Sequence, residues 1–91
     1  MLTLRWEAEA SRQFRDTLTY IASHNVAAAE GLDEAIGRKL DLLRQFPESG
    51  RPGRVAGSRE LVVHPNYVVV YAVKRTTIDI VRFLHVRQLY P

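Results

Sequence analysis

The spacing of hydrophobic residues changes near residue 50 and predicts helices before that point and strands after it. Leu2–Trp6 alternates apolar and polar side chains, which predicts a short first strand. From residue 8 to residue 23 the apolar positions recur at spacings of four, four and three, as on one face of a helix. These positions are Ala10, Phe14, Leu18 and Ile21.

A second helix is predicted from about Val26 to Gln45. Asn25 stands directly before it and can cap the helix with its side-chain oxygen. Phe46-Pro47 ends it, because proline cannot continue a helix. The apolar stripe of this helix consists of Leu32, Ile36, Leu40 and Leu43. The short connection between the two stripes predicts an antiparallel helical hairpin.

Three further strands are predicted after residue 50, where the hydrophobic period becomes two. They are Arg59–His64, Tyr67–Val73 and Thr77–Val86. The middle one is nearly all apolar and β-branched or aromatic, which is typical of a strand covered on both faces. Short links predict an antiparallel meander. The order β-α-α-β-β-β predicts one α+β domain over residues 1–91, with the helical hairpin on one face of the sheet.

A segment rich in glycine and arginine, GRPGRVAGSREL at residues 50–61, joins the two halves. A phosphate-binding loop needs glycines that lead into a helix N-terminus, whereas these glycines follow a helix and precede a strand. We therefore expect turns, with positive φ at Gly50 and Gly53 around Pro52 and a bulge or tight bend at Gly57. The candidate binding residues displayed by this segment are Arg51, Arg54 and Arg59.

Charge is distributed unevenly along the chain, whose formal net charge is +3. Residues 1–50 carry six Lys/Arg against eight Asp/Glu, a net charge of −2. Residues 51–91 carry seven Lys/Arg against two Asp/Glu, a net charge of +5. A basic half suits an acidic protein partner or a nucleic acid. A solvated surface with some salt bridges explains the same charge equally well, so both interpretations stay open.

Composition limits the chemistry and the compartment. The 91 residues include no cysteine, which excludes disulfides and thiolate chemistry and fits a reducing compartment. No apolar run approaches the roughly 18 residues that a membrane span needs, and the N-terminus has no signal core. We therefore expect a cytoplasmic protein. The scattered histidines and carboxylates show no metal-site spacing, so we predict no metal and no cofactor.

Several motifs occur in an order and spacing that characterise a known family. They are Trp6 with Ala10, Tyr20-Ile21, GRPGRV at 50–55, SRELVV at 58–63, NYVVVY at 66–71 and VRFLHVRQLYP at 81–91. With these motifs, the chain resembles the ParE branch of the RelE/ParE superfamily, the toxins of bacterial toxin–antitoxin pairs. The resemblance covers nearly the whole chain and implies two helices packed on a twisted antiparallel sheet.

The resemblance implies one of two activities. RelE-type members cleave mRNA in the ribosome, whereas ParE-type members poison DNA gyrase and are not known to be catalysts. RelE-type enzymes place lysines on the second strand, an arginine on the third, another near the end of the fourth and a tyrosine beyond it. Here the second-strand positions hold Glu60 and Val62, and the third-strand position holds Val68. Arg87 matches well and Tyr90 lies near the right region, so the pattern favours the ParE branch.

An RNA-cleaving alternative would use a different set of residues. His64, His85 and Arg87 would supply acid–base and cationic groups if the strands bring these side chains together. The competing interpretation is that His64 is a surface residue at a strand end and that His85 is a hydrogen-bonded residue of the sheet.

Three other charged residues of the strands are predicted to be structural. Arg59 and Glu60 are adjacent and point to opposite faces of the sheet, and each is expected to pair with a neighbouring charge. Arg82 is expected on one face with Ile80 and Leu84, as a buried or half-buried arginine.

These observations lead to the hypothesis of a toxin that inhibits or poisons DNA gyrase by protein contact and is neutralised by a cognate antitoxin. The candidate target contacts are the tail Arg87, Gln88, Leu89 and Tyr90, and a basic patch of Arg51, Arg54 and Arg59. The alternatives are a ribosome-dependent mRNA endoribonuclease, and an inactive homologue that only binds its antitoxin. The resemblance further implies an acidic or amphipathic antitoxin segment, and either a homodimer or a hetero-oligomer with the antitoxin. Nucleic acid would be reached only indirectly, and no membrane is involved.

Overall fold

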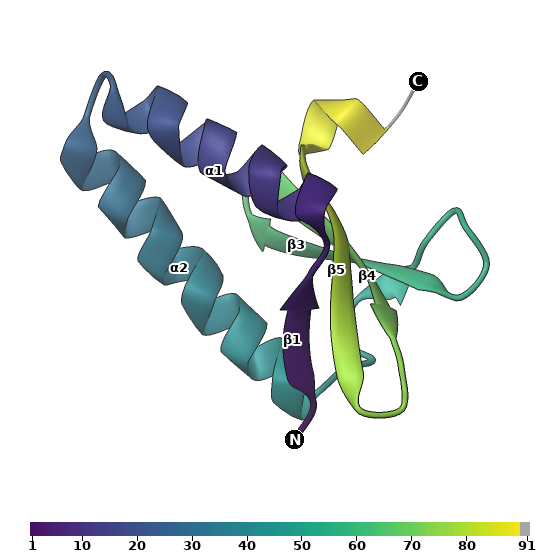
Figure 1. Ribbon diagram of the computed structural model, residues 1–91. Coiled ribbons are helices and arrows are strands. Elements are labelled where there is room, and N and C mark those ends of the chain that lie inside the picture. The colour runs from purple at the N-terminus through teal and green to yellow at the C-terminus, as the bar shows by residue number, and fades with distance from the viewer. Residues whose placement is uncertain (90–91) are drawn as a thin grey trace.

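One sheet carries both helices on the same face, as the computed structural model shows (Figure 1). The structure describes residues 1–89. In chain order the elements are β1 (Thr3–Trp6), α1 (Ala8–Ala22), α2 (Val26–Gln45), β2 (Arg51–Pro52), β3 (Ser58–His64), β4 (Tyr67–Val73), β5 (Thr77–His85) and the 3-10 helix η1 (Val86–Leu89). The strands lie in the order β1-β5-β4-β3-β2, with β1 parallel to β5 and the other pairs antiparallel.

The predicted α+β arrangement is confirmed, and one short strand is added to it. The N-terminal strand, the helical hairpin and the meander β3-β4-β5 are all present. Asn25 caps α2 as expected, because its Oδ1 accepts the Ala28 N–H at 3.0 Å. The added strand is β2, in which Arg51 lies opposite Glu60. Two residues are too few to carry a hydrophobic period, so the sequence pattern does not reveal this strand.

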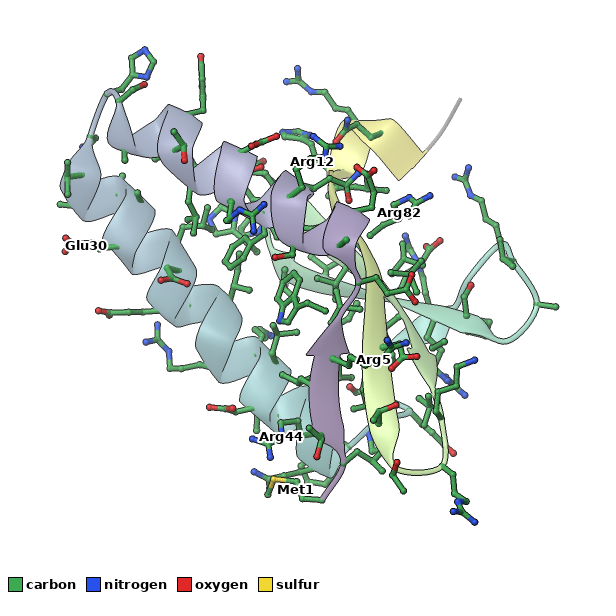
Figure 2. All side chains as sticks on the ribbon, viewed as in Figure 1. Met1, Arg5, Arg12, Glu30, Arg44 and Arg82 are labelled. Carbon is green, nitrogen blue, oxygen red and sulfur yellow. The ribbon has the colours of Figure 1, made fainter. Side chains whose placement is uncertain are left out.

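A series of aromatic contacts ties the elements of the core together. The rings of Trp6 and Phe14 are stacked with centroids 5.2 Å apart, and Phe14 lies 4.9 Å from Phe83. Phe83 in turn stacks on Tyr67 at 5.2 Å, so four rings connect β1, α1, β5 and β4. The fully buried aliphatic side chains between the helices and the sheet are Ile36 and Leu43 of α2, Val69 of β4, and Ile78 and Ile80 of β5. Near the N-terminus, Arg44 of α2 donates a hydrogen bond from Nε to the Leu2 carbonyl oxygen at 2.9 Å (Figure 2). This bond ties the end of α2 to the start of the chain.

A β-bulge interrupts the pairing of β4 with β5. Tyr71 lies opposite Ile80, whereas the preceding residue of β4, Val70, lies opposite Arg82. One residue of β5 is therefore left without a partner, and the alternation of faces reverses beyond it. Ile80 and Phe83 both face the core, while Arg82 is exposed. The prediction that Arg82 shares a buried face with Ile80 is wrong, because a strict period of two does not run through the bulge.

The glycines of the connecting segment are required for different reasons than predicted. Within residues 1–89, the glycine with positive φ is Gly57 at 85°, so the expected positive φ at Gly50 and Gly53 is wrong. Gly50 is instead required by close packing. A Cβ atom at this position would lie 2.6 Å from Tyr71 Oη and 2.7 Å from the Glu60 carbonyl oxygen.

The Tyr71 hydroxyl fastens the segment after α2 to the sheet. Tyr71 Oη donates a hydrogen bond to the Pro47 carbonyl oxygen at 2.8 Å and accepts one from the Gly50 N–H at 3.0 Å. The Tyr71 residue is fully buried, and this burial raises the pKa of Tyr71 above its usual value. The hydroxyl therefore stays protonated and available as a donor over the whole ordinary pH range.

Replacing this hydroxyl tests its contribution to stability. We expect Tyr71→Phe to lower the free energy of unfolding by about 1–3 kcal/mol, because a buried backbone N–H and a carbonyl oxygen lose their partner. Urea unfolding followed by circular dichroism measures the change. Tyr20→Phe is the matched control, since Tyr20 is 70% exposed and should show almost no change. Equal stability of wild type and Tyr71→Phe would contradict the assigned role.

Candidate functional site

The face of the sheet that points away from the helices carries the positions expected to hold cations in an RNA-cleaving toxin. Val69 and Tyr71 belong to the core, so the alternate residues of β4 point away from the helices. Val68 lies opposite Val62, and Val70 lies opposite Glu60. We define the far face by these cross-strand neighbours, which are Glu60, Val62, Val68, Val70, Arg82 and Leu84. The three expected positions are therefore adjacent on one surface.

The chemistry of these three positions is apolar and acidic. Val68 is fully buried without contacting the main core, and Val62 is 46% exposed. The Glu60 side chain is only 9% exposed, and its Oε1 accepts a hydrogen bond from Arg51 Nε at 3.0 Å. A phosphate group approaching this surface would meet Val62 and a neutralised carboxylate, because Val68 is fully buried. None of the three positions holds a cation, and the exposed Arg82 lies elsewhere on the same face.

Two arginines of the expected basic patch bind the protein's own chain. Arg51 forms the ion pair with Glu60, which confirms the predicted pairing of Glu60. Arg59 donates from Nη1 to the Gly50 carbonyl oxygen at 2.8 Å and the Glu48 carbonyl oxygen at 3.3 Å, so it binds backbone rather than the predicted charge. Arg54 is exposed in the connection between β2 and β3. The guanidinium groups of Arg51 and Arg59 thus hold the β2 connection in place.

A bidentate ion pair joins β1 to β5. Arg5 donates from Nε to Asp79 Oδ1 at 3.1 Å and from Nη2 to Oδ2 at 2.9 Å (Figure 2). Thr77 Oγ1 donates to the same carboxylate at 2.9 Å, and Asp79 is 4% exposed. The hydrogen bonds from Arg5 are the main cause of a pKa of Asp79 lowered from 3.8 to about 2. The carboxylate therefore stays ionised well into the acid range.

His64 and His85 lie on either side of Tyr67. The strands β3 and β5 flank β4, and in both pairings the histidine lies opposite Tyr67. The ring centroids are 5.6 Å apart for His64 and 5.5 Å apart for His85. The tyrosine ring therefore separates the two imidazoles.

Each of these histidines uses its Nδ1 atom to accept a backbone hydrogen bond. His64 Nδ1 accepts the Asn66 N–H at 3.2 Å, and His85 Nδ1 accepts the Arg87 N–H at 3.2 Å. A backbone N–H can only donate, so both rings carry the tautomer with hydrogen on Nε2 when neutral. The structure thus places His85 beside the backbone of Arg87 and His64 beyond the Tyr67 ring.

The candidate tail begins at the end of β5 and continues as η1 (Figure 1). Arg87 and Gln88 are exposed, and Gln88 Oε1 accepts the His85 N–H at 2.8 Å. The side chain of Leu89 and the whole of Tyr90 lie outside the described residues. Arg87 is therefore the tail cation that the structure places at the surface.

A mainly apolar groove of about 590 Å³ lies between α2 and β3. Its lining residues are Ala35, Arg38, Lys39, Leu42, Val62, Val63, His64 and Pro65. Leu42 is 52% exposed, and a neighbouring hollow extends the surface to Phe46, which is 61% exposed. The hydrophobic pattern of the sequence did not predict this groove. The available signal was that Leu42 and Phe46 are large apolar residues outside the stripe of α2 that contains Leu43.

A second groove, of about 420 Å³, lies between α1 and the C-terminal end of the sheet. Its walls are more polar and include Arg12, Asp16, Tyr20, Tyr67, His85 and Gln88. His64 lines the first groove and His85 lines the second. The two histidines therefore open onto different surfaces of the molecule.

The described residues contain neither a metal-binding cluster nor a membrane-spanning helix. Within residues 1–89, no group of three or more His, Cys, Asp or Glu side chains is arranged to hold a metal ion. In the same range, neither helix is long and apolar enough to cross a membrane. The longer helix, α2, carries charged side chains throughout its 20 residues.

Comparison with known proteins assigns the family. Residues 4–90 match the family model described as "ParE toxin of type II toxin-antitoxin system, parDE". The chain belongs to the ParE toxin family. It is 34% identical over 89 residues to "Putative toxin Y4kP" of Sinorhizobium fredii, covering 97% of this chain and 92% of that protein. It is 33% identical over 89 residues to "Toxin RelE2" of Caulobacter vibrioides, covering 98% and 100% of the two chains.

Solved structures show the same fold at lower sequence identity. The chromosomal ParDE toxin–antitoxin system from P. aeruginosa matches with a TM-score of 0.82 and 23% identity, covering 94% of this chain and 97% of that one. The E. coli DinJ-YafQ toxin-antitoxin complex matches with a TM-score of 0.65 and 12% identity, covering 99% and 98%. This ParE-family protein is therefore a toxin of the type II toxin–antitoxin class with the fold of the RelE/ParE superfamily.

The Arg5–Asp79 pair generates a prediction about acid stability. The pKa of Asp79 is lower in the folded state, so its ionised form stabilises the fold fully above about pH 3.8, and this contribution is lost as the pH falls through about 2. We therefore expect Asp79→Asn to unfold at a lower urea concentration than wild type at neutral pH. The difference should shrink between pH 3.8 and about 2. A difference that stays constant down to pH 2 would contradict this assignment.

Proposed function

We propose that this toxin inhibits DNA gyrase by protein contact and does not cut RNA itself. The supporting observation is the chemistry of the far face, where Glu60, Val62 and Val68 occupy the expected cation positions. RNA cleavage by attack of a 2′-hydroxyl needs a base, an acid and cations that stabilise the phosphorane. Two valines and an ion-paired glutamate supply none of this stabilisation. Gyrase and its DNA are cytoplasmic, so the proposed site of action is the cytoplasm.

The histidines support the same proposal. Tyr67 separates His64 from His85, and each Nδ1 already accepts a backbone hydrogen bond. A general base and a general acid must both reach one scissile group within hydrogen-bond distance. Two imidazoles that open onto different grooves do not meet that requirement.

The proposed contact with gyrase is the tail that begins with Arg87. Arg87 is exposed on η1, beyond the last residue of β5. Arginine is among the residues that contribute most to protein–protein interfaces, because its planar guanidinium forms several hydrogen bonds at once. In the proposed second patch, Arg51 pairs with Glu60, Arg59 binds the Gly50 carbonyl oxygen, and Arg54 is exposed in the connection between β2 and β3.

The ribosome-dependent endoribonuclease remains the second candidate, and one specific observation favours it. A relative at 33% identity is called "Toxin RelE2", although its name concerns that protein alone. In this chain, such an activity would depend on His85 with Arg87, which follow each other closely at the end of β5. An inactive homologue that only binds its antitoxin is the third candidate.

The proposed antitoxin site is the groove between α2 and β3. Its exposed apolar side chains, Leu42 and Val62, would accept the apolar side of an amphipathic segment, and Arg38 with Lys39 would attract acidic residues. Within residues 1–89, β2 pairs only with the first part of β3, so the outer edge beyond Glu60 has no strand partner. That edge would accept an added strand through its backbone groups.

Two reactions on the purified toxin separate the candidates. We expect loss of gyrase supercoiling or accumulation of cleaved DNA, and no cuts in mRNA mapped after in vitro translation. Arg87→Ala should raise the toxin concentration for half-inhibition about thirtyfold, which is typical of an interface arginine. Arg15→Ala removes another exposed arginine, on α1, and serves as the matched control. Truncation after Val86 should abolish inhibition while the protein stays folded.

The opposite pattern would overturn the proposal. Codon-phased mRNA cuts together with normal gyrase activity would identify an endoribonuclease. A folded protein truncated after Val86 that remains fully toxic would disprove the role of the tail.

A substitution in the groove tests the antitoxin site. Leu42→Asp should weaken binding of the cognate antitoxin by about thirtyfold, because it places a charge in an apolar contact. Isothermal titration calorimetry measures the dissociation constants. Ala27→Asp adds the same carboxylate to the exposed start of α2 and should leave binding nearly unaffected. Equal weakening by both variants would show that net charge, rather than this groove, determines affinity.

A further inference from the structure

Three consecutive backbone N–H groups donate hydrogen bonds that hold the junction between β5 and the tail. His85 N–H donates to Gln88 Oε1 at 2.8 Å, and Arg87 N–H donates to His85 Nδ1 at 3.2 Å. Between them, Val86 N–H donates to the Asn66 carbonyl oxygen at 2.8 Å. The acceptors come from three places, which are η1 itself, the end of β5 and the turn between β3 and β4.

Two of these bonds form a reciprocal cap. The side chain of His85 accepts from the backbone two residues ahead, and the side chain of Gln88 accepts from the backbone of His85. Serine or threonine with glutamate or glutamine makes a similar exchange in the capping box of ordinary helices, where the hydroxyl accepts from the N–H three residues ahead. Here the ring nitrogen of a histidine takes the place of the hydroxyl oxygen. The first turn of η1 therefore has a fixed direction relative to β5.

The third bond links this cap to the neighbouring turn. Asn66 accepts Val86 N–H with its carbonyl oxygen and donates its own N–H to His64 Nδ1. His64 and His85 also pack against the two sides of Tyr67, whose ring stacks on Phe83. The start of the tail is thus connected to the core through both histidines and through Tyr67.

We propose that His85 and Gln88 are positioning residues that aim the tail at its target, and that His64 supports them through Asn66. This assignment depends on the proposed function in one respect, since it takes the tail to be the contact surface. It gives both histidines a role other than acid–base catalysis. It also changes the expected role of Gln88, because Gln88 Oε1 binds the toxin's own backbone.

Pairs of substitutions at each position separate positioning from direct contact. Gln88→Leu removes the acceptor oxygen, whereas Gln88→Glu keeps an acceptor that capping boxes use equally well. His85→Ala removes both the acceptor and the packing on Tyr67, whereas His85→Asn restores a strong capping side chain without the ring. Gln45→Leu makes the first change at an exposed glutamine on α2 and serves as the control.

The measurements are growth arrest in cells, gyrase inhibition and amide hydrogen exchange. We expect Gln88→Leu and His85→Ala to raise the toxin concentration for half-maximal effect about fivefold, the ratio that loss of a typical cap produces. Gln88→Glu and His85→Asn should recover most of that loss. The His85 and Arg87 amide protons should exchange about fivefold faster in the two impaired variants and near the wild-type rate in the rescued ones.

The outcomes distinguish this inference from the proposed function. Equal losses in Gln88→Leu and Gln88→Glu would overturn positioning, because a residue that touches the target through its amide group loses that contact in both. Unchanged exchange of the His85 and Arg87 amides in Gln88→Leu would show that no cap forms. If wild type arrests growth without affecting gyrase, the gyrase proposal fails, and the pattern of rescue in growth arrest still decides whether the cap positions the tail.

Discussion

The unpaired residue of β5 controls which side chains of the C-terminal half face the helices. Ile78 and Ile80 precede it and point into the core, and Phe83 follows it and also points into the core. Without this shift, Arg82 would point under the helices and Phe83 would point outward. A buried guanidinium without a partner is very unfavourable, and the series of four rings from Trp6 to Tyr67 would lose Phe83. Because of the bulge, β5 exposes Arg82 to solvent and still contributes Phe83 to the aromatic core.

The same shift also determines how the end of β5 meets the tail. It places His85 on the side of Tyr67, where the ring can pack and its Nδ1 can reach the backbone of Arg87. Ile80 is the last residue of β5 opposite β1, and beyond it α1 supplies the partner. Gln13 Oε1 accepts the Phe83 N–H at 3.0 Å, so the backbone stays bonded where β1 has ended. Local pairing geometry therefore connects the core to the surface that we propose for target contact.

The sequence predicts the parts of this structure that depend on neighbouring residues, and it fails where residues far apart in the chain interact. Both helices have long apolar stripes, so their limits are predicted to within one residue. The placement of Arg82 is predicted wrongly, because a bulge depends on how two strands pair and leaves no mark on one strand alone. The requirement for Gly50 arises from Tyr71, 21 residues away, and is equally invisible in the local pattern. The positions of His64 and His85 around Tyr67 require the register of three strands.

The candidate site likewise contains features that the sequence predicts and features that it does not. The exposed position of Arg87 could be expected from its place at the end of a strand. Its anchoring by His85 and Gln88 could not, since histidine is not a common capping residue. The sequence predicts the far face only in part. The motifs identified its three positions, and the strand register was needed to show that they are neighbours.

The parallel pairing of β1 with β5 has a consequence for the order of folding. Thr3 lies beside Thr77, so β1 finds its partner only after β5 has been synthesised. A pairing between such distant segments forms late, because a long loop must be closed before it gains any contact. The nascent chain on the ribosome therefore lacks a completed sheet until β5 has been synthesised.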